Sequence, residues 1–274
     1  MNNAEVRERS CRFGEHGRLA GIITEPVRSP RAAVVMVTAG LTPKFGPFRL
    51  YAQLARRLAG DGLLVLRFDL GGIGDSVPAS TALPLKKRTE MEIRAAIDHL
   101  SGHGVAGGLV LGGLCSGAED AFRYAAIDPR VTGLFLIDPF AFPTFGWIWR
   151  DYLIRGVRRG LALAGLLPTY RAGDDDESSL IHYEYMRYDE CSRIMRALVA
   201  RNVGMHFVYT GGMRKTFNHK RQFSAMFRDI DFQDPPTVDY FPQLRHTQVL
   251  QADRELVIES IARGLSSALI RCAA

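Results

Sequence analysis

One cysteine of this 274-residue chain has neighbours that predict a nucleophile. An apolar run, Gly108 to Leu111, predicts a short buried strand, and helix-forming residues follow at 118–125. Between them lies Gly113-x-Cys115-x-Gly117, in which cysteine occupies the position of serine in the usual G-x-S-x-G pattern. A strand, a tight glycine-flanked turn and a helix form a nucleophile elbow, whose strained backbone leaves no room for neighbouring side chains. The pattern therefore predicts that Cys115 attacks a substrate.

Two other interpretations of this segment remain open. Ser116 is an alternative nucleophile, but its own frame places Leu114 where the turn needs a glycine. Cys115 could instead be a structural cysteine beside a glycine turn, because free cysteine packs as a small hydrophobic residue. The remainder of the chain favours the catalytic interpretation.

The elements that must position this residue alternate along the chain. Two edge strands joined by a turn are expected within 9–26, and apolar runs then alternate with segments that have helical spacing. The expected strands are 32–37, 63–68, 108–111, 131–137, 205–210 and 237–241, and the expected helices are 49–59, 85–100, 118–125, 188–201, 218–227 and 254–269. This alternation predicts an α/β fold with a mostly parallel central sheet and helices on both faces.

The alternation breaks between about 140 and 185. Aromatic and aliphatic residues are interleaved with arginines from 145 to 166, and an acidic run follows at 174–177. We interpret 140–185 as a helical cap insertion over the C-terminal ends of the strands, between core segments 1–139 and 186–274. Such a cap would shape an apolar acyl pocket. The alternative is a surface helix that packs on the body.

Four features in this order resemble the α/β-hydrolase superfamily over almost the whole chain. They are Ala39-Gly40-Leu41 after an apolar strand, the strand-and-loop segment 67–76, the elbow, and a histidine just before the last helix. More narrowly, 38–43, Gly46-Pro47 and the elbow resemble hydrolases associated with the exosortase A system. They also resemble Cys-dependent acyl-transfer and Dieckmann-cyclase proteins of the same fold. The resemblance implies the α/β-hydrolase fold with a helical cap.

The resemblance also implies roles for individual residues. The histidine before the last helix is His246, which would be the general base for Cys115. The backbone N–H groups of Leu41 and Ser116 would form the oxyanion hole.

The acidic residue departs from the usual layout of the superfamily. It usually follows the strand at 205–210, but the loop 211–218 contains no carboxylate. A second position used in the superfamily, the end of the strand after the elbow helix, is occupied by Asp138. This assignment keeps the chain order nucleophile, acid, histidine. The alternative for Asp138 is a turn aspartate before Pro139.

These residues predict acyl transfer through a thioester acyl-enzyme. A thiol is weakly ionised near neutrality, so Cys115 needs a base or the N-terminal dipole of the elbow helix. We expect a thioesterase, esterase or acyltransferase whose substrate is an acyl ester or thioester, with coenzyme A or an acyl carrier protein as candidate carriers. A Dieckmann-type cyclase on a carrier-bound chain is an alternative. A catalytically inert binding protein is another, because the usual acid loop lacks a carboxylate.

Composition and motifs narrow the classes of ligand. The net charge of +6 comes without a dense Lys/Arg tract, so we expect no nucleic-acid partner, although an acidic carrier would suit this charge. No P-loop or dinucleotide fingerprint follows a strand, and the His and Cys residues lack ligand spacing. We therefore expect no cofactor and no metal.

Cellular location is predicted from the start of the chain and its cysteines. The first residues lack the apolar core of a signal peptide, and the four cysteines are widely spaced. The most apolar stretch, 133–149, contains an aspartate and two prolines, so no membrane span is expected. A cytoplasmic, reducing location is the expectation.

Overall fold

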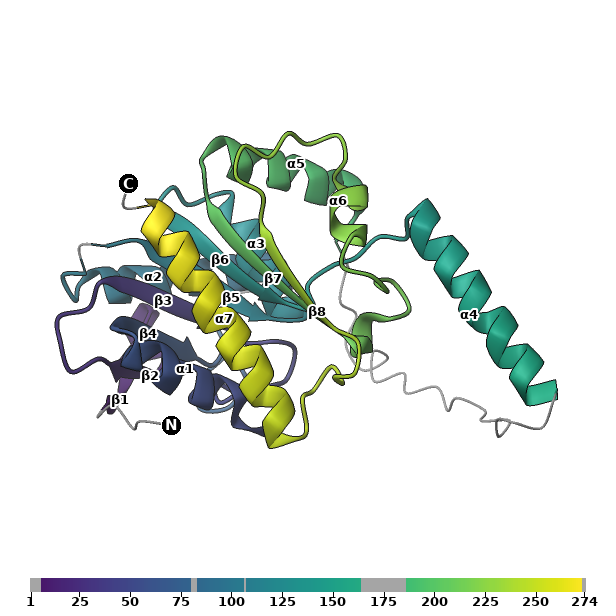
Figure 1. Ribbon diagram of the computed structural model, residues 1–274. Helices are drawn as coiled ribbons and strands as arrows, with labels where there is room; N and C mark the ends of the chain where they lie inside the picture. Colours follow the sequence, from purple (N-terminus) through teal and green to yellow (C-terminus); the bar gives the residue numbers. More distant parts are fainter. Residues whose placement is uncertain (1–5, 80–82, 106, 164–185, 273–274) are drawn as a thin grey trace.

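An eight-stranded sheet with the order β1-β2-β4-β3-β5-β6-β7-β8 forms the centre of the protein (Figure 1). The computed structural model describes residues 6–79, 83–105, 107–163 and 186–272. The strands are β1 (Arg7–Phe13), β2 (Leu19–Glu25), β3 (Ala32–Val37), β4 (Leu63–Phe68), β5 (Leu109–Leu114), β6 (Val131–Ile137), β7 (Gly204–Thr210) and β8 (Thr237–Phe241). β2 pairs antiparallel with β1 and β4, and all other neighbours are parallel. The expected mostly parallel sheet is confirmed.

Helices cover both faces of this sheet. α1 (Leu50–Gly60) and α7 (Gln251–Cys272) pack on one face, where their apolar residues join β3, β4 and β6 in one buried cluster. α2 (Leu85–Ser101), α3 (Ser116–Ala125), α5 (Tyr188–Ala200) and α6 (Gln222–Met226) contribute to the cluster on the other face. Short 3-10 turns occur at Glu15–Gly17, Pro47–Arg49 and Gly211–Met213. The central strands β3, β4 and β5 are buried along their whole length, as their unbroken apolar runs predict.

Two helices differ in extent from the sequence-based expectation. The segment 218–227 forms only the short helix α6, because the side chain of Gln222 bonds the preceding backbone. Its Oε1 accepts from the N–H of Asn218 at 3.0 Å, and its Nε2 donates to the carbonyl of Thr216 at 2.6 Å. These bonds hold the residues before α6 in a turn. The last helix begins at Gln251, three residues earlier than expected.

α4 (Phe145–Leu163) is the described part of the segment interpreted as a cap, and it extends away from the body (Figure 1). Near its N-terminus, Arg150 Nε donates to Asn218 Oδ1 at 2.9 Å, and Asn218 Nδ2 donates to the carbonyl of Trp147 at 3.3 Å. Its large apolar side chains that are more than half exposed are Phe145, Ile148, Trp149, Tyr152, Leu153, Ile154 and Val157. Residues 164–185 of the expected cap lie outside the described residues, so the boundaries of that cap stay a prediction.

Candidate active site

Cys115 lies in the tight turn between β5 and α3, as the motif predicts. Its backbone is in the left-handed region, with φ 54° and ψ −123°. A Cβ atom on Gly113 would lie 2.7 Å from the carbonyl oxygen of Val37, and one on Gly117 would lie 2.5 Å from the same oxygen. Both positions therefore require glycine, because the backbones of the elbow and of β3 approach too closely for a side chain.

Asp138 follows β6 directly and is almost completely buried. His246 lies in the loop between β8 and α7, and its Nδ1 atom is 2.8 Å from Oδ2 of Asp138. Thr210, the last residue of β7, donates to the same carboxylate from its backbone N–H to Oδ1 and from its hydroxyl to Oδ2, each at 2.6 Å. Because β6 and β7 are parallel neighbours, their C-terminal ends bring the acid and its threonine partner together. Thr210 was not predicted from the sequence.

His246 is held as a cation by its two neighbours. Burial alone would lower the pKa of His246, but hydrogen bonds to Asp138 and Cys115 and the negative charges on both raise it to about 10. The imidazole is therefore protonated near neutral pH. A positive charge beside a thiol stabilises the thiolate, which is the nucleophilic form. The structure thus brings together Cys115, His246 and Asp138, which are far apart in the sequence.

The two expected oxyanion residues lie at the elbow and in the loop after β3. Ser116 follows Cys115 and opens α3, and Leu41 lies in the loop after β3. The backbone N–H of Leu41 donates to no acceptor among the described residues. An amide without an internal partner is available to a developing oxyanion. The N–H of the adjacent Gly40 instead donates to the Ser116 hydroxyl at 3.1 Å.

A buried lysine that the sequence did not single out fixes the loop that carries Leu41. The Nζ atom of Lys44 is 2.7 Å from Oδ2 of Asp69 and 2.5 Å from Oδ2 of Asp75, and its backbone N–H donates to Asp69 Oδ1 at 2.5 Å. Asp69 is fully buried after β4. This ion pair therefore joins the loops after β3 and β4. The available signal was an isolated aspartate at the end of an apolar strand.

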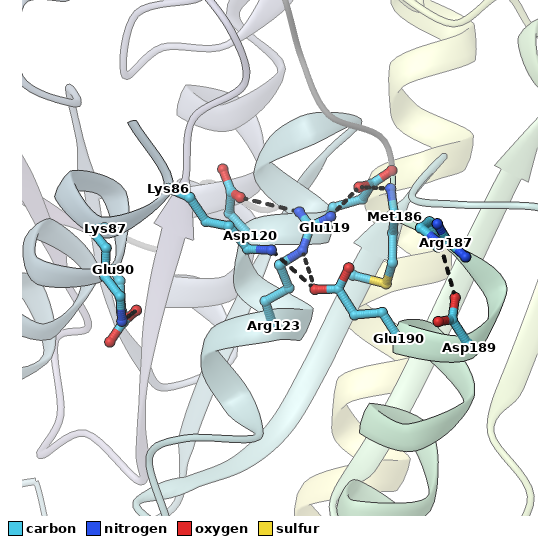
Figure 2. Close-up of polar contacts among 10 residues, drawn as sticks. All are labelled: Lys86, Lys87, Glu90, Glu119, Asp120, Arg123, Met186, Arg187, Asp189 and Glu190. Atoms are coloured by element: carbon cyan, nitrogen blue, oxygen red, sulfur yellow. Dashed lines mark hydrogen bonds and ion pairs between the residues drawn. The ribbon is translucent and has the colours of Figure 1, made fainter. Parts of the chain in front are cut away.

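An ionic cluster links α3, the helix that follows Cys115, to α5 (Figure 2). Arg123 of α3 lies 3.0 Å from Glu190, 3.3 Å from Glu119 and 3.6 Å from Asp120, measured between nitrogen and oxygen atoms. Glu119 also accepts from the backbone N–H of Met186 at 3.1 Å. The first turn of α3 is therefore tied to Met186, two residues before α5. Burial raises the pKa of Asp120 to about 6, although Arg123 and Lys86 oppose that shift.

Among the described residues, no three or more His, Cys, Asp or Glu side chains are grouped so that they could hold a metal ion. No described helix combines the length and apolar character needed to cross a membrane.

No protein-family model and no curated protein matches the sequence. Solved structures do match over nearly the whole chain. An esterase from Pyrococcus furiosus is 13% identical with a TM-score of 0.65. That match covers 98% of this chain and 91% of the esterase chain. An α/β serine hydrolase without a lid from Xanthomonas campestris is 14% identical with a TM-score of 0.59. That match covers 97% of this chain and 95% of the hydrolase.

The chain has the α/β-hydrolase fold. An esterase domain from a Rhodothermus marinus protein supports the same conclusion, at 16% identity and a TM-score of 0.56, with 94% of this chain and 97% of that chain covered. At these identities the likeness establishes the fold alone. The reaction of this α/β-hydrolase-fold protein must be argued from its own residues.

Proposed function

We propose that the protein is an acyl-transfer enzyme in which Cys115 attacks an ester or thioester and His246 and Asp138 assist it. The observation that carries this proposal is the contact chain from Cys115 through His246 to Asp138 at the elbow. A nucleophile beside a base that a third group orients is the recurring arrangement of covalent catalysis. The esterases among the matching structures support a reaction at an ester bond.

The reaction begins with attack of the Cys115 thiolate on the acyl carbonyl carbon. The carbonyl oxygen becomes an oxyanion, which the N–H groups of Leu41 and Ser116 would stabilise. When the C–O or C–S bond to the leaving group breaks, the His246 imidazolium gives its proton to the departing oxygen or sulfur. The product is a thioester between the acyl group and Cys115, with His246 neutral.

The second half of the reaction reverses the proton movement. Neutral His246 takes a proton from water or from another acyl acceptor. The deprotonated oxygen or other nucleophilic atom then attacks the thioester carbonyl carbon. Collapse of the second oxyanion returns sulfur to Cys115 as thiolate and leaves His246 protonated. In both halves of the reaction, the hydrogen bonds of Asp138 with Thr210 and His246 fix the direction of the imidazole.

We further propose that the acyl group is apolar and that the segment 140–185 forms a cap for it. The loop at 211–218 supports this placement, because it approaches both the histidine and α4. A Cβ on Gly212 would lie 2.6 Å from the Cβ of His246, and Asn218 holds the N-terminal part of α4. The loop 211–218 therefore links His246 to the end of α4 at which its exposed aromatic and aliphatic side chains begin. A carrier such as coenzyme A or an acyl carrier protein fits the net charge of +6.

A panel of p-nitrophenyl esters and acyl thioesters tests the proposal. We expect turnover, together with an increase in intact mass of one acyl group that maps to Cys115. Cys115→Ala should abolish both, whereas Cys11→Ala, which removes a half-buried thiol on β1, should abolish neither. A protein that binds these compounds with no turnover and no adduct at any chain length would be an inert binding protein.

A further inference from the structure

A buried tyrosine hydroxyl joins the two strands that end at the proposed oxyanion hole. Tyr51 lies in the first turn of α1 and is almost completely buried. Its hydroxyl donates to the carbonyl of Val37 at 2.9 Å and accepts from the N–H of Leu114 at 2.8 Å. Val37 is the last residue of β3, and Leu114 directly precedes Cys115.

A second hydroxyl makes the equivalent link on the other side of the nucleophile. Ser116 directly follows Cys115, and its hydroxyl accepts from the N–H of Gly40 at 3.1 Å. The backbone register of β3 with β5 extends to Val37 opposite Gly113 and goes no further. Beyond that point, the Tyr51 hydroxyl connects Leu114 to the end of β3, and the Ser116 hydroxyl connects the elbow to the loop that carries Leu41.

We propose that Tyr51 and Ser116 are positioning residues that fix the spacing between the two backbone donors of the oxyanion hole. The inference rests on the proposed function, which assigns those donors to the N–H groups of Leu41 and Ser116. One hydroxyl holds the residue before Cys115, and the other holds the residue before Leu41. Neither hydroxyl needs to touch substrate, because each acts on the backbone that supplies a donor.

The burial of these groups makes their hydrogen bonds effective constraints. Burial raises the pKa of Tyr51, so its hydroxyl stays protonated and continues to donate to Val37. Without that hydroxyl, the buried N–H of Leu114 and the carbonyl of Val37 lose a partner, and the backbone must shift to find another. A misplacement of about 1 Å lowers a rate by about 10²-fold, which is similar to the loss of one oxyanion donor.

The experiment compares two reactions of the same sulfur. Acylation by a p-nitrophenyl ester forms an oxyanion, whereas alkylation by iodoacetamide is a direct displacement that forms none. For Tyr51→Phe and Ser116→Ala we expect acylation at least tenfold slower than in wild type. The rate of Cys115 alkylation should stay within twofold of the wild-type rate. The KM for the ester should stay within threefold of the wild-type value, so that the loss in acylation appears in kcat.

Two variants control for the loss of a buried hydroxyl as such. Tyr124→Phe removes a buried tyrosine hydroxyl that donates to Asp128, and Ser260→Ala removes a buried serine hydroxyl that donates to Asp239. Both should acylate at the wild-type rate. The two test variants are independent, so one of them still decides the matter if the other fails to fold.

Three results would overturn the inference. Wild-type acylation rates in both test variants would show that the hydroxyls position nothing. Equal losses in acylation and alkylation would show damage to the nucleophile itself. If wild type is alkylated but never acylated, the proposed function fails and the inference falls with it, which separates that result from the first two.

Discussion

Asp138 and His246 are separated by 108 positions in the chain, yet Nδ1 of the histidine lies 2.8 Å from Oδ2 of the carboxylate. Asp138 is placed by the end of β6 and His246 by the loop before α7, so the contact depends on the sheet and the last helix together. Thr210 supplies two further hydrogen bonds to the same carboxylate. Three hydrogen bonds therefore fix the position of this buried carboxylate.

The first prediction concerns this acid. Asp138→Asn should lower kcat by about 10³ to 10⁴-fold, because an amide cannot both accept from His246 and stabilise its positive charge. Steady-state kinetics with the best ester of the panel measures the loss. Asp98→Asn is the matched control, since Asp98 is an exposed carboxylate paired with Arg130. Full activity in Asp138→Asn would mean that another carboxylate serves as the acid.

The second prediction concerns the chemical class of the acyl donor. A thiolate exchanges readily with thioesters, because the attacking and leaving groups are chemically alike. We expect a higher kcat/KM for one acyl group on coenzyme A or a carrier protein than for its oxygen ester. An oxygen ester that is better by tenfold or more, about 1.4 kcal/mol in transition-state binding, would instead identify an ordinary esterase.

The third prediction is a loss of stability in alkaline solution. The pKa of His246 is about 10 in the folded protein and 6.5 in the unfolded chain, so the folded state binds the extra proton between these values. Its contribution is complete below about pH 6.5 and is lost as the pH rises through about 10. Thermal unfolding from pH 6.5 to 10 should show a steeper fall in Tm for wild type than for His246→Gln. The exposed-site variant His16→Gln should follow wild type, and identical slopes for all three proteins would contradict the prediction.

The fourth prediction concerns the ionic cluster around Arg123, between α3 and α5. Arg123→Gln should reduce the free energy of unfolding by about 3 kcal/mol, because it removes a cation that lies 3.3 Å from the buried carboxylate of Glu119. Urea denaturation measures this change. Arg155→Gln breaks an exposed ion pair with Asp151 and should change stability by less than about 1 kcal/mol. A second substitution, Glu119→Gln, should recover part of the loss.

The sequence predicted those features that depend on local patterns. Unbroken apolar runs located the central strands, since a strand buried on both faces can hold few polar groups. The glycines around Cys115 predicted the elbow, because the backbone there permits no Cβ. Asp138 was predicted from its place at a strand end, which is where the sheet brings it beside His246.

Other features depend on contacts between distant segments. Lys44, Tyr51 and Thr210 are ordinary residues in their own segments, and only the fold shows what their side chains bond. The amphipathic pattern of α4 predicted a helix but contained no information on its direction relative to the body. The start of α6 depends on one glutamine side chain and was missed for the same reason.

The direction of α4 suggests how the protein could be divided into two pieces. A cut after Arg159, an exposed residue in the C-terminal part of this helix, separates a fragment with β1 to β6 from one with β7, β8 and α7. Cys115 and Asp138 remain on the first fragment, and His246 is on the second. The fragments would rejoin along the parallel edge between β6 and β7 and through the packing of α7 on β6. Activity would then report the association of any two proteins to which the halves are fused.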